Sequence, residues 1–98
     1  MTHRALKKRY GRANRAMLSI DAHHHALSIL NHARAQANQF DGMTSDGVAR
    51  RARYLRGQAA RIRRYLRSYP TAIEFIRHLE DWATKDEYRA EALRREGH

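Results

Sequence analysis

The sequence lacks several features that would each indicate a particular class of protein. It contains no cysteine, which excludes disulfide bonds, thiolate metal sites and a cysteine nucleophile. It has a single proline, and no apolar run approaches the roughly 20 residues that a membrane-spanning helix needs. No hydrophobic stretch typical of a signal peptide follows the basic start. We therefore expect a cytoplasmic protein with no membrane partner.

Acidic residues are scarce, and they are unevenly placed. Residues 1–70 contain 15 Lys and Arg against 3 Asp and Glu, a net charge of +12, whereas residues 71–98 contain 5 against 7, a net charge of −2. The codon bias of a GC-rich genome would explain the preference for arginine over lysine, but not the excess of basic over acidic residues. A clustered excess of this size is typical of a protein that binds a polyanion. The predicted partner is therefore nucleic acid or an acidic protein surface.

Aromatic residues are also few, with two Phe and one Trp, so the core must consist mainly of Leu, Ile and Ala. The clearest helical pattern spans residues 44–69, where apolar residues recur at steps of four and three. These are Val48, Ala52, Leu55, Ala59, Ile62, Leu66 and Tyr69. A similar stripe precedes it: Ala22, Ala26, Leu30, Ala33, Ala37 and Phe40, which overlaps an earlier stripe over residues 6–27.

Between these two patterns lies a short loop, residues 41–47, that is rich in Asp and Gly. Thr44 or Ser45 can cap the helix that follows it. Because the connection is short, we expect helices over residues 19–39 and 45–69 to be antiparallel neighbours. Residues 1–16 are predicted to form a basic N-terminal arm that is partly helical.

The chain after Pro70 is predicted to form shorter helices that pack across this pair. Thr71 and Glu74 fit a capping box, and a second such pattern predicts a boundary or kink near residues 83–84. With a helix boundary there, Asp86 is predicted to be an ordinary acidic residue near the start of the last helix. The sequence as a whole predicts a single all-α domain over residues 1–98. We expect a small bundle of three to five helices centred on the antiparallel pair.

Catalytic and metal-binding motifs are absent from the sequence. It has no Gly-rich phosphate loop, nucleophile elbow or HExxH pattern, so we expect no catalytic residue and no cofactor. The consecutive His23, His24 and His25 point about 100° apart on a helix and cannot converge on one ion. We therefore expect no metal site, while a pH-sensitive or ligand-contacting role for these histidines stays open beside that of a polar surface patch.

The arginines of the second helix carry the main functional signal. Arg50, Arg53, Arg61 and Arg64 fall opposite the apolar stripe, with the remaining arginines at its flanks. Guanidinium groups suit phosphate oxygens, and tyrosines beside them can stack on bases. The alternative is a solvated helix face whose arginines pair with acids elsewhere in the fold. The predicted binding residues are Arg50, Arg53, Arg56, Arg61, Arg63, Arg64 and Arg67, with Tyr54 and Tyr65, and with Lys7, Lys8, Arg9 and Arg12 of the arm.

Three functions fit these observations. The first is a small basic accessory protein that binds nucleic acid through phosphate contacts with little base specificity. The second is a small inhibitor or adaptor, of the type that phages and mobile elements encode, which binds a protein or nucleoprotein partner through the same arginines. The third is a structural bundle that forms a homodimer through a remaining apolar face.

Overall fold

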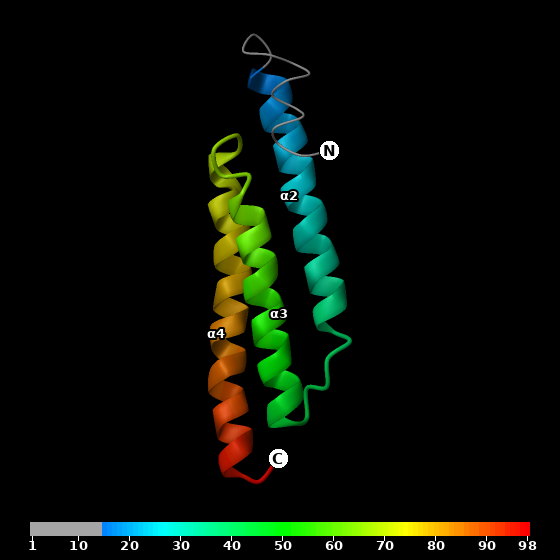
Figure 1. Cartoon of the computed structure of the whole chain (residues 1–98), viewed down its shortest axis with the longest axis vertical. Helices are drawn as coiled ribbons and strands as arrows, with labels where there is room; N and C mark the ends of the chain where they lie inside the picture. Colours follow the sequence, from blue (N-terminus) through cyan, green and yellow to red (C-terminus); the bar gives the residue numbers. More distant parts are fainter. Residues whose placement is uncertain (1–14) are drawn as a thin grey trace.

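Three α-helices form the part of the protein that the computed structural model describes, which comprises the backbone of residues 15–98 and the side chains of residues 19–98. They are α2 (Arg15–Ala37), α3 (Ser45–Arg63) and α4 (Ile73–Arg95), and a short 3-10 helix, η2 (Pro70–Ala72), precedes α4. The helices lie side by side and alternate in direction (Figure 1). The predicted all-α class is confirmed. The cationic residues predicted for the arm, Lys7, Lys8, Arg9 and Arg12, lie outside the described residues.

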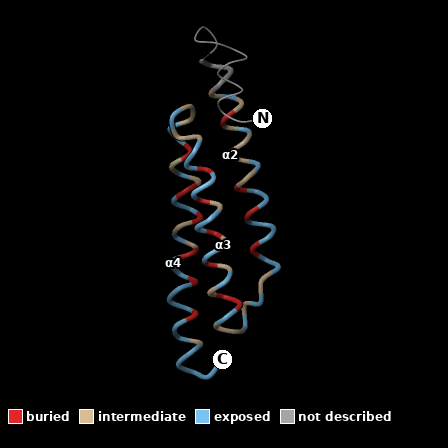
Figure 2. Tube along the Cα trace, viewed as in Figure 1, coloured by how far each residue is buried: buried red, intermediate tan, exposed pale blue. Residues whose placement is uncertain are grey.

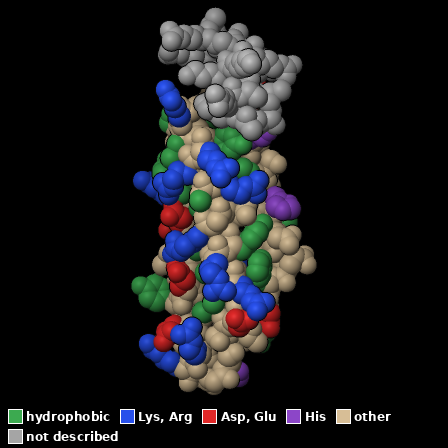
Figure 3. Space-filling model, in the orientation of Figure 1, with side chains coloured by type: hydrophobic (Ala, Val, Ile, Leu, Met, Phe, Trp, Pro, Cys, Tyr) green, Lys and Arg blue, Asp and Glu red, His purple; other side chains and the backbone are tan. Residues whose placement is uncertain are grey.

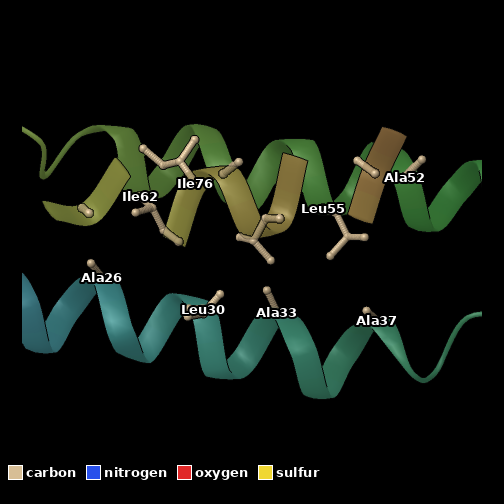
Figure 4. Packing of buried hydrophobic residues seen from close by; sticks show 12 residues of the cluster. Ala26, Leu30, Ala33, Ala37, Ala52, Leu55, Ile62 and Ile76 are labelled. Atoms are coloured by element: carbon tan, nitrogen blue, oxygen red, sulfur yellow. The ribbon is translucent and has the colours of Figure 1, made fainter. Parts of the chain in front are cut away.

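The predicted contact between α2 and α3 is confirmed, but α3 shares a much larger interface with α4. The reason is the size of the buried side chains. Leu55 and Ile62 of α3 are fully buried, as are Ile76 and Leu79 of α4. Over residues 19–37, where its side chains are described, the buried face of α2 consists mostly of alanine, with Leu30 as the one large buried residue (Figure 4). The helix pair with the larger hydrophobic contact is therefore α3 and α4, and α2 packs against them.

The buried residues of α2 belong to only one of its two predicted stripes. Ala22, Ala26, Leu30, Ala33 and Ala37 form an inward-facing row of buried residues, one on each turn (Figure 2). In the earlier stripe, over residues 6–27, the described members Ile20 and His24 are exposed, and Leu27 is partly buried against the core. Small side chains let a helix approach its neighbours closely, so the alanine-rich stripe is the one that faces the core.

The loop before α3 is held by its own polar side chains. The Asp41 carboxylate accepts hydrogen bonds from the Met43 backbone N–H (2.9 Å) and the Thr44 hydroxyl (3.3 Å). Thr44 is the N-cap of α3 and accepts from the N–H of Gly47 at 3.1 Å, as predicted. A Cβ atom at residue 47 would overlap the Asp41 carbonyl oxygen, so this position requires glycine.

The prediction that the central helix continues to Tyr69 is wrong, because α3 ends at Arg63. The residues that follow form turns in which backbone N–H groups bond to carbonyls three residues earlier. Examples are Tyr65 to Ile62 (2.9 Å) and Leu66 to Arg63 (3.2 Å). Pro70 then holds Tyr69 away from helical geometry, with φ of −142° and ψ of 81°.

Two predictions about the C-terminal region are also wrong. Thr71 does not cap a helix, because it lies inside η2, and the residue before α4 is Ala72, which makes no side-chain cap. No boundary occurs near residues 83–84, since α4 continues to Arg95. The Thr84 hydroxyl donates to the Glu80 carbonyl one turn earlier (3.0 Å), so its hydrogen bond is satisfied inside the helix.

A buried ion pair joins α3 to α4. The Arg51 guanidinium donates two hydrogen bonds of 2.8 Å to the Asp86 carboxylate, and the two side chains are 16% and 5% exposed. The guanidinium also lies 5.7 Å from the ring centre of Trp82. The hydrogen bonds to Asp86 raise the pKa of Arg51 above its usual value, so the pair stays charged. The prediction that Asp86 is surface charge at a helix start is therefore wrong.

We predict that Asp86→Ala destabilises the protein by about 3–5 kcal/mol, because it leaves the Arg51 charge buried without a partner. Urea unfolding followed by circular dichroism measures this loss. The matched control is Glu91→Ala, which removes exposed ion pairs with Arg94 and Arg95 and is expected to change stability by at most about 0.5 kcal/mol. Equal effects of the two substitutions would contradict the structural role of the pair.

Candidate nucleic-acid interface

The outer surface of α3 is lined with arginine side chains, because the larger apolar residues of this helix point inward. Buried residues recur at steps of three and four along α3, so the positions between them face solvent. Figure 3 shows Lys and Arg side chains along much of one face of the molecule. The predicted arginines are all exposed: Arg50, Arg53, Arg56, Arg61, Arg63, Arg64 and Arg67.

Three of these arginines form ion pairs within the fold. Arg56 donates to Glu87 and also to the Thr84 hydroxyl (3.1 Å), and the Glu87 hydrogen bond raises the pKa of Arg56. Arg63 donates to Glu80 at 3.0 Å. Arg50 lies 3.1 Å from Asp46 on the same helix, with both side chains more than 60% exposed. Partial neutralisation by acids of the C-terminal helix, the alternative considered from sequence, therefore occurs on the side of α3 that faces α4.

Four arginines keep their charge without an acidic partner among the described residues. We call them the uncompensated arginines: Arg53, Arg61, Arg64 and Arg67. Arg61 donates a 2.8 Å hydrogen bond to the neutral amide oxygen of Gln58, which leaves its charge in place. Three of the four lie within or beside the last turn of α3. This end of the helix therefore carries the densest unneutralised positive charge of the arginine surface.

The surface between Arg53 and Arg64 is low and open. These two positions are about 20° apart around the helix and about 16 Å apart along it, at 100° and 1.5 Å per residue. Gly57 and Ala60 lie between them on the same face, and both are exposed. No atom lies within 4 Å of where a Cβ at residue 57 would be, so packing does not require glycine there. The sequence already contains this spacing, since Gly57 and Ala60 fall between the two arginines at helical periodicity.

The two predicted tyrosines contact ring side chains from α2 and from the loop that follows it. The ring of Tyr54 lies 5.4 Å from that of Phe40, and its hydroxyl is buried without a hydrogen-bond partner among the described residues. The ring of Tyr65 is stacked on His25, with centroids 5.8 Å apart and an interplanar angle of 2°. Both rings therefore have ring partners within the fold, and the role of Tyr54 and Tyr65 as stacking platforms beside the arginines stays a prediction.

The histidines point in different directions, as their consecutive positions imply. His23 contacts the ring of Tyr69 edge-on at 4.9 Å, His25 stacks on Tyr65, and His24 is exposed. These contacts fasten the beginning of α2 to the turn that follows α3. They give two of the histidines a packing role that the sequence did not indicate, because it depends on how α2 and the turn meet.

The described part of the chain contains no group of three or more His, Asp or Glu residues placed to hold a metal ion. None of the helices in residues 15–98 combines the length and apolar character required to cross a bilayer. Comparison of the chain with protein-family models, curated proteins and solved structures finds no match.

We predict that Tyr54→Phe changes the alkaline stability of the protein. Burial raises the pKa of Tyr54 above its usual value of 10.0, so the folded state holds this proton more tightly than the unfolded state. That contribution is fully present below about pH 10 and is lost as the pH rises through the folded-state pKa. The melting temperature of Tyr54→Phe should therefore fall less than that of wild type between pH 9 and pH 11, values chosen to bracket the usual pKa.

At pH 7 the same variant is expected to be as stable as wild type or slightly more stable, because it removes a buried hydroxyl that has no partner. Tyr88→Phe is the control, since Tyr88 is 77% exposed. Parallel melting-temperature curves for wild type, Tyr54→Phe and Tyr88→Phe would show that Tyr54 is not buried in solution.

Proposed function

We propose that this protein is a small basic accessory protein that binds nucleic acid through phosphate contacts with little base specificity. The observation that carries the proposal is the set of uncompensated arginines at the end of α3. The acids of α4 that could neutralise α3 are already paired with Arg51, Arg56 and Arg63. The remaining charges are therefore available to a partner outside the described residues.

Phosphate is the partner that fits these side chains best. The guanidinium group presents paired N–H donors that match phosphate oxygens, and it stays charged at any physiological pH. Because the four groups lie on the surface, they can reach a polyanion without the helices moving apart. Binding of this kind is driven by the release of counterions from the nucleic acid, so it depends on charge and not on sequence.

Low base specificity follows from the side chains that lie between the arginines. Reading a base edge usually needs Asn or Gln, or an Arg or Lys that is held in a fixed direction. Gln58 is the one amide side chain on α3, and its oxygen already accepts from Arg61. Gly57 and Ala60 offer no polar side chain. The surface therefore binds phosphates and does not recognise particular bases. We expect the protein to bind nucleic acid in the cytoplasm without catalysing a reaction.

An acidic protein surface is the second candidate partner. The ion pairs of Arg56 with Glu87 and of Arg63 with Glu80 are examples of arginines on this helix binding carboxylates. An inhibitor or adaptor would use Arg53, Arg64 and Arg67 in the same way. Nucleic acid is the better fit, since a regular row of phosphates neutralises several arginines at once.

We predict that Arg53→Glu combined with Arg64→Glu weakens binding to nucleic acid similarly for every sequence. Fluorescence anisotropy at several salt concentrations gives the slope of log affinity against log salt. Loss of two phosphate contacts should reduce that slope by about 2, at about 0.9 per phosphate on B-DNA. Both positions are exposed, so the stability cost should stay within about 0.5 kcal/mol per site.

The matched control is Lys85→Glu combined with Arg95→Glu, which changes the net charge equally on exposed positions of α4. This control should keep most of the wild-type slope. A salt-independent wild-type affinity, or equal effects of the two double variants, would contradict the proposal. If wild type instead retains a protein partner from cell lysate after nuclease treatment, and Arg53→Glu with Arg64→Glu loses it, the inhibitor function is supported.

A further inference from the structure

We infer that the nucleic acid bound at the uncompensated arginines is double-stranded, and that one sugar–phosphate backbone crosses α3 over Gly57 and Ala60, between Arg53 and Arg64. This inference rests on the proposed function and specifies its substrate. Three observations carry it: the occupied aromatic rings, the low surface between the two arginines, and the fixed spacing of these arginines on one helix.

Single-stranded nucleic acid is bound by stacking its bases on exposed aromatic rings, and each stacked base contributes substantially to affinity. The aromatic side chains near the arginine surface already have partners within the fold. These partners are Phe40 for Tyr54, His25 for Tyr65, and His23 with Phe75 for Tyr69. Tyr88 is 77% exposed, but it lies on the outer side of a different helix, half a turn around α4 from the buried Leu79. Tyr54, Tyr65 and Tyr69 are partly buried and already in contact with other rings, which makes them less available to stack on the bases of a single strand.

The low surface between Arg53 and Arg64 allows close approach of a bulky backbone. Gly57 has no side chain and Ala60 has only a methyl group, and both are exposed. Glycine within an exposed helix is less favourable than alanine, and no neighbouring atom explains its presence at position 57. A phosphate ridge that passes over these two residues comes within reach of arginines on both sides.

A duplex suits arginines that are held at a fixed spacing. Arg53 lies on α3 and Arg64 is the C-cap residue of that helix, with helical φ and ψ, so the helix backbone sets their spacing. A duplex backbone is rigid, and it carries about one charge per 1.7 Å of axis when both strands are counted. A single strand has a lower charge density and would lose conformational freedom on binding, with less stacking to offset that loss. DNA and RNA duplexes both present a rigid backbone with a high density of phosphate charge.

The first experiment compares substrates with the wild-type chain. Fluorescence anisotropy is measured with a 20-base-pair DNA duplex, the matching RNA duplex and each single strand, in the same buffer at two salt concentrations. We expect at least one duplex to bind about tenfold more tightly than its own single strand. The DNA and RNA arms identify which duplex the protein prefers.

The second experiment uses substitutions that leave every charge in place. Gly57→Gln and Ala60→Gln fill the low surface with a neutral side chain that favours helix, so the fold is expected to be retained. Each should weaken duplex binding by about tenfold. Ala35→Gln is the matched control, because Ala35 is an exposed position on α2, and its affinity should equal that of wild type. Thermal melts of all variants confirm folding.

The outcomes separate this inference from the proposed function. Tighter binding to single strands, or unchanged duplex affinity in both Gly57→Gln and Ala60→Gln, would overturn the inference while the general nucleic-acid function stands. Equal effects of Ala35→Gln and Gly57→Gln would also overturn it. Absence of binding to every nucleic acid at low salt would contradict both proposals.

Discussion

The buried ion pair between Arg51 and Asp86 is the contact on which the arrangement of the other charges depends. It joins α3 to α4 at a point with little access to water, where each charge needs the other. Two further ion pairs join the same helices, Arg56 with Glu87 and Arg63 with Glu80. A step of seven residues forward on α3 corresponds to seven residues back on α4, so one alignment of the two helices produces both pairs.

This alignment divides the arginines of α3 into two sets. Those directed toward α4 are neutralised and stabilise the helix pair, whereas Arg53 and Arg64 point away from it and have no acid within reach. The same helix can therefore hold the fold together on one side and present charge on the other. The alanine-rich α2 leaves this outer surface uncovered, because its contacts with α3 involve the core residues and the rings of Tyr54 and Tyr65.

Sequence periodicity predicted the helical class and the inner face of α3, since burial imposes a regular spacing on apolar residues such as Leu55 and Ile62. It also placed Arg53 and Arg64 opposite the apolar stripe, and both are exposed. It could not predict which arginines are neutralised, because this depends on the register between two helices that are distant in sequence. Asp86 was misassigned for that reason. The apolar pattern predicted a helix to Tyr69, whereas α3 ends at Arg63. The hydrogen bonds that tighten the turns after Arg63 do not change the spacing of the apolar residues, so the pattern could not predict this end.

The central claim is that the arginines of α3 form two sets and that only the unpaired set contacts phosphate. Nitrogen-detected NMR of the arginine side chains, recorded during titration with a short DNA or RNA duplex, measures this directly. The account predicts that the Nε–H signals of Arg53, Arg64 and Arg67 shift with duplex concentration. It predicts that those of Arg51, Arg56 and Arg63 stay in place. Shifts spread equally over both sets, or confined to the paired arginines, would contradict it.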